Sequence, residues 1–301
     1  MKSYEPFYIE TFNKGLIKKK RDQAFEMMAS CNLCPRKCNV NRLSNETGVC
    51  KTGRNALVSN FNPHFGEEPP LVGQNGSGTI FFAGCNLKCN FCQNYDISHF
   101  GHGEKTTDLQ LSKMMLMLQL AGCHNINFVT PSHVIPQILS ALEIAIPEGL
   151  KVPIVYNTSA YDRVETIKLL EGIFDIYMPD FKFWDQKVAQ MTCKAPDYPE
   201  IARKAIIEMH RQVGNFTINT TGTATRGLLI RHLVLPEGLA GTKKIMNFIA
   251  QKISIDTYVN IMPQYRPCGK AHEIDKLSRR LSMNDYKTAL LEAEEEKIKI
   301  V

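Results

Sequence analysis

The sequence has no long hydrophobic run. None of its segments approaches the ~18 continuous apolar residues that cross a membrane, so we expect no transmembrane helix and no membrane partner. The N-terminus, MKSYEPFYIETFNKG, also lacks the apolar stretch and the cleavage-site pattern of a secretion signal. Together these two absences predict a cytoplasmic protein, whose cysteines stay reduced and are free for metal binding or redox chemistry.

Internal repeats and low-complexity linkers are absent too. The chain has 301 residues, of which 44% are hydrophobic, and this predicts one large domain or one domain with an appendage. The formal net charge is +6, and the run KGLIKKKR (14–21) supplies part of it. Such a run is usually the solvated face of a helix, the alternative being a contact with nucleic acid or an acidic partner. Since no basic stripe with interleaved aromatic residues accompanies it, we expect that nucleic acid is not the partner.

Short apolar runs alternate with helical patterns through most of the chain. The runs have the β-branched and aromatic composition of buried parallel strands, and they lie at 78–83, 125–130, 152–158, 174–179, 227–235 and 257–262. The helical patterns lie at 107–121, 133–146, 161–171, 197–213, 240–252 and 282–296. This alternation predicts an α/β fold, either a partial (β/α)6 barrel or a doubly wound sheet. In both folds the chemistry lies at the C-terminal ends of the strands.

The N-terminal part of the chain has a different character. Residues 8–30 have the pattern of a helix, and residues 31–77 form a loop-rich segment with many Asn, Gly, Pro and Cys residues. We therefore predict three parts. They are an N-terminal helix with a Cys-rich metal-binding segment (1–77), a partial barrel (78–265) and a C-terminal helical tail (266–301).

Three of the ten cysteines follow the first apolar run directly. Cys85, Cys89 and Cys92 have the spacing C-x3-C-x2-C, and their position after a strand places them at the chemically active edge of the sheet. Thiolates bind zinc or iron–sulfur clusters, and a [4Fe–4S] cluster with only three cysteine ligands keeps one iron open for chemistry. The alternative is a zinc site that His99 or His102 completes.

A second group of cysteines lies in the N-terminal segment. It has the ligand count of a closed zinc site or of a fully ligated iron–sulfur cluster, and its members are Cys31, Cys34, Cys38 and Cys50. The segment is polar, so a metal centre would give it a reason to fold. We expect a second metal centre here and favour a cluster over zinc, because a cluster could relay an electron. The isolated Cys123 and Cys193 are expected to be buried apolar residues.

The stretch GCNLKCNFCQN (84–94), with Phe91 directly before the last cysteine, resembles the radical S-adenosylmethionine (radical SAM) superfamily. Within it, the stretch is similar to the glycyl-radical-enzyme activases such as pyruvate formate-lyase activating enzyme. The whole chain resembles a pyruvate formate-lyase activating enzyme-like branch whose members begin with a segment like CNLCPRKC (31–38). The resemblance runs from there to QYRPCGKA (264–271) and beyond.

This resemblance implies a fold, two cofactors and a reaction. The fold is a partial (β/α)6 radical SAM barrel, here with a Cys-rich N-terminal extension. A [4Fe–4S] cluster on the three cysteines would bind S-adenosylmethionine through its amino and carboxylate groups and cleave it reductively. The resulting 5′-deoxyadenosyl radical would abstract hydrogen from a substrate, as in an oxidoreductase-type enzyme. A reductant such as flavodoxin or ferredoxin is an implied partner, and a glycyl radical enzyme is a candidate protein substrate.

The resemblance also assigns individual residues. Asp180 and Lys182 in MPDFKF and Arg231 in LLIRHLVLPE would contact S-adenosylmethionine, the two cations at its carboxylate. The alternatives are an ordinary surface ion pair for the first two residues and a buried structural ion pair for Arg231. Phe91 would pack near the adenine, or simply anchor its loop. Independently of the resemblance, the position of Asn157 at the end of the third strand suits a contact with the ribose or the amine, or a cap on the following helix.

Some positions depart from the activases or carry no fixed role. The activases hold the methionine amine with Gly-Gly-Glu after the second strand, where this chain has the Thr-Pro-Ser-His of residues 130–133, so Thr, Ser and His are the candidates here. Near the sixth strand, MPQYR replaces Pro-Tyr-His and leaves the substrate open. Cys268, in the loop after that strand, is a candidate hydrogen donor to a substrate radical, or else a passive loop residue. Glu67 and Glu68 are candidates for a functional role, but we expect them to be exposed carboxylates of a turn.

Two other classes of protein fit parts of the sequence. One is a non-catalytic electron carrier with iron–sulfur or zinc sites, which would not cleave S-adenosylmethionine. The other is a zinc-containing nucleic-acid-binding protein, which would bind in a strongly salt-dependent way.

Overall fold

The computed structural model describes residues 4–301. Its N-terminal part contains two helices, α1 (Phe7–Asn13) and α2 (Leu16–Ala29). The prediction of one helix over 8–30 is therefore wrong, because Gly15 interrupts it. Gly15 has a φ of 69°, a left-handed conformation that glycine adopts at little cost and that ends a right-handed helix.

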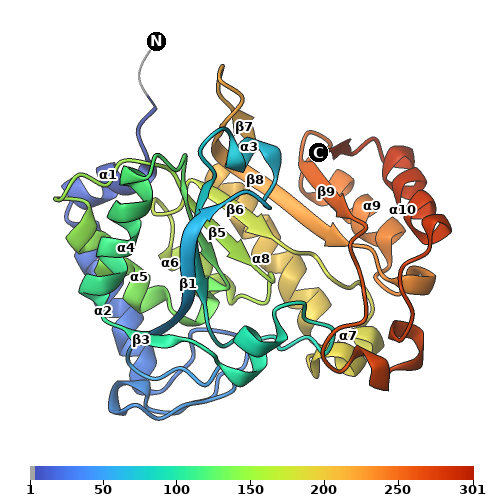
Figure 1. The fold of residues 1–301 in the computed structure, drawn as a ribbon, viewed down its shortest axis with the longest axis horizontal. Coiled ribbons are helices and arrows are strands. Elements are labelled where there is room, and N and C mark those ends of the chain that lie inside the picture. The colour runs from blue at the N-terminus through green and yellow to red at the C-terminus, as the bar shows by residue number, and fades with distance from the viewer. Residues whose placement is uncertain (1–3) are drawn as a thin grey trace.

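A ten-stranded sheet forms the centre of the molecule (Figure 1). Its parallel strands are β2 (Ser77–Phe82), β4 (Ile126–Val129), β5 (Ile154–Thr158), β6 (Ile176–Pro179), β8 (Ala224–Leu233) and β9 (Tyr258–Met262). They coincide with the apolar runs of the sequence and confirm the predicted α/β fold with a largely parallel sheet. The strand order is β10-β9-β8-β6-β5-β4-β2-β1-β3. The size of the partial barrel remains a prediction.

Four further strands extend this sheet. They are β1 (Ala56–His64) and β3 (Glu104–Thr106), which run antiparallel beyond β2, β7 (Thr217–Ile218) beside β8, and β10 (Lys299–Ile300) beside β9. Strand β1 lies in the segment predicted to be loop-rich. Only Ala56 and Val58 are buried in it, so it lacks the apolar run that marks a buried strand. Residues 1–77 thus contribute a strand to the central sheet, and the division of the chain near residues 77 and 265 stays a prediction.

Helices lie between or after the strands of the sheet. They are α3 (Pro69–Val72), α4 (Asp108–Leu120), α5 (Ile135–Ala145), α6 (Val164–Leu169), α7 (Gln186–Cys193), α8 (Tyr198–Val213), α9 (Thr242–Lys252) and α10 (Met283–Glu295). In Figure 1, α2, α4 and α5 lie to the left of the sheet, and α9 and α10 lie to its right. Helix α7 was not predicted. It begins where the Asp185 carboxylate accepts hydrogen bonds from the backbone N–H groups of Lys187 and Val188.

Aromatic side chains fill the core beside the parallel strands. Phe174 packs edge-on against Phe128 and Tyr156, with ring centroids 6.1 and 4.8 Å apart, and Tyr156 meets Tyr177 at 5.6 Å. These contacts hold neighbouring strands side by side, so that their C-terminal ends lie along one edge of the sheet. Within residues 4–301, no helix is both long enough and apolar enough to span a membrane.

Candidate functional site

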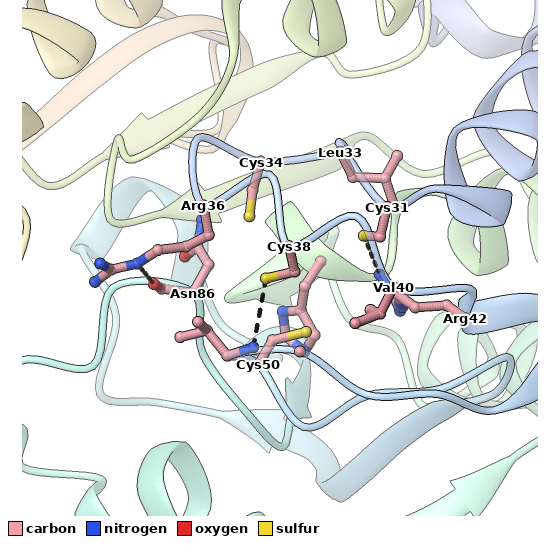
Figure 2. Close-up of a pocket in the computed structure, with 12 residues that line it drawn as sticks. Cys31, Leu33, Cys34, Arg36, Cys38, Val40, Arg42, Cys50 and Asn86 are labelled. Carbon is pink, nitrogen blue, oxygen red and sulfur yellow. Dashed lines mark hydrogen bonds between the residues drawn. The ribbon is translucent and has the colours of Figure 1, made fainter.

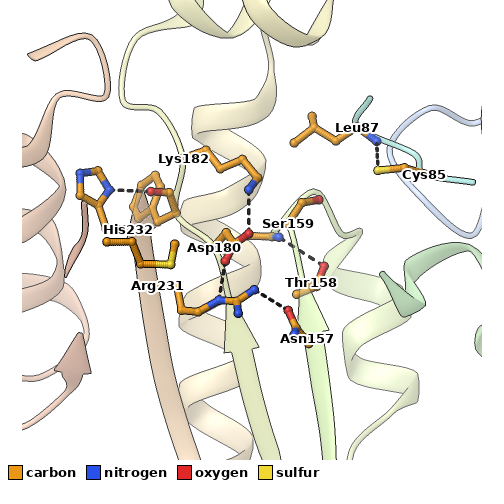
Figure 3. A network of polar contacts seen from close by, with 12 residues as sticks. Cys85, Leu87, Asn157, Thr158, Ser159, Asp180, Lys182, Arg231 and His232 are labelled. Atoms are coloured by element: carbon orange, nitrogen blue, oxygen red, sulfur yellow. Dashed lines mark hydrogen bonds and ion pairs between the residues drawn. The ribbon is translucent and has the colours of Figure 1, made fainter. Parts of the chain in front are cut away.

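A large open cavity lies at the C-terminal edge of the parallel strands. Its volume is about 430 Å³, and its wall includes residues of β8 and of the loops that follow β2, β4, β5, β6 and β9. Several residues that the sequence singled out line it together, namely Cys85, Cys89, Phe91, Cys92, Asn157, Asp180, Lys182 and Arg231. Figure 3 shows part of this set, with Cys85 across the cavity from the polar group around Asp180. Segments far apart in the chain therefore meet at the edge that the fold class predicts.

The three thiols lie in one tight loop. The backbone N–H of Leu87 donates a hydrogen bond to the Cys85 Sγ over 3.4 Å, and Lys88 has a φ of 55°, which turns the chain sharply before Cys89. Burial raises the pKa of the Cys85 thiol to about 12, and a hydrogen bond with Cys193 together with burial raises the pKa of Cys89. Buried thiols of this kind ionise when a bound cation compensates their charge, which suits a metal centre.

The zinc alternative for these thiols has no preformed set of ligands among the described residues. Within residues 4–301, no three Cys, His, Asp or Glu side chains converge on one ion position. His99, a candidate zinc ligand, has its Nδ1 2.9 Å from the Ser98 hydroxyl and its ring stacked on Tyr95 at 3.9 Å. A [4Fe–4S] cluster binds each thiolate through a different iron, so it needs thiols that surround a space and do not share one point.

An ion-pair network forms the opposite wall of the cavity. Asp180 accepts hydrogen bonds from Lys182 Nζ and from Arg231 Nε, both over 2.7 Å, and Arg231 also donates to Asn157 Oδ1 over 2.7 Å (Figure 3). Asp180 follows β6 and Arg231 lies in the neighbouring β8, so the parallel register brings them together. Although burial alone would raise the pKa of Asp180, the charges of Arg231 and Lys182 lower it overall. Asp180 is therefore an ionised bridge between two cations.

Glu67 and Glu68, which the sequence analysis expected to be exposed, complete this network. Glu67 accepts a hydrogen bond from Arg231 over 3.2 Å, and Glu68, only 4% exposed, accepts one from Asn260 over 2.9 Å. The expectation of an exposed turn is wrong, because the segment between β1 and β2 folds over the sheet and buries Leu71 against it. Burial raises the pKa of Glu67 to about 7, against the opposing effect of Arg231. The two prolines that follow the glutamates were the available signal, since they fix this segment as the start of α3.

The cavity wall offers further groups to a ligand. Phe91 is 4% exposed and packs edge-on against Phe183 and Tyr265, with centroids 5.9 Å away in both cases. It anchors its loop, and an adenine contact stays a prediction. Ser159 lines the cavity, and its buried hydroxyl has no hydrogen-bond partner within the described part of the chain. A polar atom of a bound molecule would satisfy it, so the cavity fits a ligand with hydrogen-bonding groups.

Of the Thr-Pro-Ser-His segment after β4, Thr130 lies at the cavity, and Ser132 and His133 make other contacts. Thr130 lines the cavity and has a left-handed φ of 62°. Ser132 lies instead against the Thr158 hydroxyl, 3.1 Å away, and His133 has its Nε2 3.0 Å from the Ala83 carbonyl. Of the three candidates for the methionine amine, Thr130 is therefore the one placed at the cavity.

The isolated cysteines differ in their surroundings. Cys123 and Cys193 are both buried, as predicted, at 3% exposure. Cys193 also lies close enough to Cys89 to raise the pKa of that thiol, a proximity that its sequence position did not reveal. Cys268 is half-buried in the loop after β9 and is not among the residues that line the cavity. Its role as a hydrogen donor stays a prediction.

The four N-terminal cysteines gather around a second, smaller pocket (Figure 2). Arg36, from the same segment, fastens it to the first thiol loop. Its guanidinium donates hydrogen bonds to the carbonyls of Asn86, Leu87, Cys193 and Lys194 over 2.8–3.2 Å. Sequence reasoning assigned no role to Arg36, because its partners are backbone atoms and leave no mark in the sequence.

Comparisons with known proteins agree with this geometry. Residues 79–226 match the model of the Radical SAM superfamily. The "Uncharacterized protein MJ0674" of Methanocaldococcus jannaschii is 32% identical, in an alignment that covers 97% of this chain and 82% of that protein.

Two solved structures are also similar. Native anSMEcpe with bound AdoMet and Kp18Cys peptide has a TM-score of 0.50 and 14% identity, covering 72% of this chain and 60% of that one. A radical SAM methyltransferase from Sphaerobacter thermophilus has a TM-score of 0.49 and 14% identity, covering 74% of this chain and 65% of that one. The chain thus covers less than two thirds of either structure, and the likeness to the first is one of fold.

Proposed function

The chain belongs to the radical SAM superfamily, and on that premise we propose that it is a cytoplasmic, oxidoreductase-type enzyme of the pyruvate formate-lyase activating enzyme-like branch. Cys85, Cys89 and Cys92 hold its [4Fe–4S] cluster. When bound, the cluster and S-adenosylmethionine supply reductive cleavage of the sulfonium and hydrogen abstraction from a substrate. The observation that carries the proposal is the meeting of three thiols and two cations in one cavity.

The cations provide a place for the cofactor carboxylate. Lys182 has one partner among the described residues, Asp180, so two of its three N–H donors remain for a ligand. Arg231 presents a planar guanidinium, which matches a carboxylate well. Asp180 stays ionised and keeps both cations at 2.7 Å, so its part is to orient them and not to transfer a proton.

The cavity also offers groups for the cofactor amine. Glu67 and Thr130 both line the cavity, and together they provide a carboxylate and a hydroxyl for the group that Gly-Gly-Glu holds in the activases. Asn157 and Ser159, at the end of β5, provide an amide and a free hydroxyl for the ribose. Phe91 provides an aromatic edge for the adenine.

The partners follow from the reaction. The cluster needs an external one-electron reductant of the flavodoxin or ferredoxin type. A glycyl radical enzyme is the candidate protein substrate, supported by the resemblance of the C-x3-C-x2-C loop to the activases. The MPQYR stretch after β9, which replaces their Pro-Tyr-His, is where a different substrate would be accommodated.

The proposal is tested by reconstituting the protein anaerobically with iron and sulfide and reducing it with dithionite in the presence of S-adenosylmethionine. We expect 5′-deoxyadenosine in the wild type. We expect Lys182→Ala to yield less while it retains its cluster absorbance. The matched control, Lys204→Ala, removes an exposed cation of α8 and should match the wild type. Absence of 5′-deoxyadenosine from cluster-loaded wild type would reject the proposed activity.

A further inference from the structure

We propose that Cys31, Cys34, Cys38 and Cys50 bind a second [4Fe–4S] cluster, ligated entirely by this chain and seated behind the loop that carries Cys85 and Cys89. This inference goes beyond the proposed function, because it concerns a different pocket and does not depend on S-adenosylmethionine.

The first support is the shape of the pocket. The four cysteines line one small pocket, and three of them, Cys31, Cys34 and Cys50, are buried (Figure 2). Apolar side chains close the space between them, namely Leu33, Val40 and Val49. Four thiols that line one pocket match the ligand count of a fully ligated [4Fe–4S] cluster.

Zinc is the alternative metal centre for four thiols. A tetrahedral zinc ion holds each sulfur at about 2.3 Å, so its ligands must converge on one point. No three of the cysteines do so within residues 4–301. We favour a cluster because the pocket adjoins the loop that carries Cys85 and Cys89, where a second cluster could relay an electron to the first.

The backbone of the segment shapes this pocket. Cys31 and residues 39 and 40 pair as a short ladder, in which Cys31 donates to the Val40 carbonyl over 2.9 Å and accepts from Asn39 over 3.0 Å. Gly48 lies against Cys38, and a Cβ at that position would come within 2.6 Å of the Cys38 sulfur. Glycine is therefore required at position 48, because any side chain there would collide with the Cys38 thiol.

Hydrogen-bond donors and positive charge face the sulfurs. The Val49 backbone N–H donates to the Cys38 Sγ over 3.5 Å, as Leu87 does to Cys85 in the first site. Arg42, only 1% exposed, donates to the Gly53 carbonyl over 3.1 Å and lies 3.9 Å from the Cys31 Sγ. Four thiolates around a [4Fe–4S]²⁺ core carry a net negative charge, and a buried guanidinium balances part of it.

The pocket lies directly against the first thiol loop. Asn86, between Cys85 and Cys89, is one of its lining residues, and Gly84 packs so closely on Cys50 that a Cβ there would come within 2.3 Å of the Cys50 carbonyl oxygen. His133 lines the pocket and reaches Ala83, one residue before Gly84. Two clusters held on opposite sides of one loop would interact magnetically when both are reduced.

The test is to measure iron, acid-labile sulfide and zinc after anaerobic reconstitution. We expect about eight irons and eight sulfides per wild-type chain and about four of each in the Cys85→Ala/Cys89→Ala/Cys92→Ala variant. Alanine at all four N-terminal positions should leave about four irons, at the first site. The matched control is Cys123→Ala, which removes a buried cysteine outside both pockets and should keep the wild-type count.

The number of iron and zinc ions per wild-type chain tests the second cluster even if a variant fails to fold. About four irons with one zinc, or about four irons with no other metal, would overturn the proposal. Iron in the triple variant also separates this inference from the proposed function. A second cluster there would stand even if the wild type did not cleave S-adenosylmethionine.

Discussion

Arg231 in β8 donates from its Nε to Asp180 Oδ1 over 2.7 Å, and this contact joins the ends of two parallel strands at the cavity. The same guanidinium reaches Glu67 from the segment between β1 and β2. Arg231 therefore lies where three parts of the chain meet, and its charge is shared by two carboxylates. A bound carboxylate would compete with Asp180 and Glu67 for Arg231. The affinity for the cofactor should therefore depend on the charges of these two residues.

Replacing Arg231 with Ala should weaken S-adenosylmethionine binding about tenfold or more, since a charge-assisted hydrogen bond contributes about 1.5–3 kcal/mol. Equilibrium binding to the cluster-loaded protein measures this effect, and the cluster spectrum should stay unchanged. The control is Lys204→Ala, on the exposed face of α8. Unchanged affinity in a folded Arg231→Ala variant would make the arginine purely structural.

Replacing Glu67 with Gln should change the pH dependence of stability. The pKa of Glu67 is raised from 4.5 to about 7 in the folded protein, so the folded state holds this proton more tightly than the unfolded state. The contribution of Glu67 to the free energy of unfolding is fully present below pH 4.5 and is lost as the pH rises through 7. Between pH 5 and 8, the free energy of unfolding of the wild type should therefore fall by up to about 3 kcal/mol more than that of Glu67→Gln.

Thermal unfolding of the two cluster-loaded proteins, without S-adenosylmethionine, measures that difference. Glu200→Gln, a change at a fully exposed carboxylate of α8, provides the control and should follow the wild type. Parallel stability curves for wild type and Glu67→Gln would contradict the burial of Glu67 against Arg231.

Replacing Arg36 with Ala should loosen the Cys-rich segment. Its guanidinium donates hydrogen bonds to the carbonyls of Asn86, Leu87, Cys193 and Lys194. The substitution therefore leaves several acceptors without this donor at once. We expect a loss of about 3 kcal/mol in the free energy of unfolding and faster proteolysis within 31–54. Lys37→Ala, at the exposed neighbouring residue, is the control. Equal protease resistance of the two variants would show that Arg36 does not fasten the segment.

Replacing Arg42 with Gln should lower the reduction potential of the N-terminal cluster, because a buried positive charge near Cys31 favours the reduced, more negative form. A redox titration in the background that lacks Cys85, Cys89 and Cys92 isolates this cluster. Arg42→Lys keeps the charge and should stay close to the parent potential. A potential that is equal or higher in Arg42→Gln would exclude this role.

The sequence predicted those parts of the fold that depend on local composition. The parallel strands are buried on both faces, so they appear as continuous apolar runs, and the motif after β2 is compact enough to be seen directly. Strand β1 escaped prediction because it lies near the edge of the sheet and only Ala56 and Val58 are buried in it. Helix α7 was missed because it is short and its start depends on a single cap at Asp185.

The candidate site was predictable to a similar extent. Asp180, Lys182 and Arg231 follow or lie within recognisable strands, so their meeting could be expected. Glu67 contacts Arg231, which is 164 positions away in the chain. Arg36 contacts the carbonyls of Asn86 and Lys194, which are 50 and 158 positions away. No local sequence pattern records such contacts. The burial of charge is a tertiary property, and it appears only once the segment between β1 and β2 is seen to fold over the sheet.

The most direct test of the account is the yield of 5′-deoxyadenosine from reduced, reconstituted protein, measured in the wild type, in the Cys85→Ala/Cys89→Ala/Cys92→Ala variant and in Cys123→Ala. The account predicts product from the wild type and from Cys123→Ala, and none from the triple variant, even when that variant still contains iron at its N-terminal site. Equal product from all three proteins would contradict the assignment of the cavity thiols as the catalytic cluster ligands.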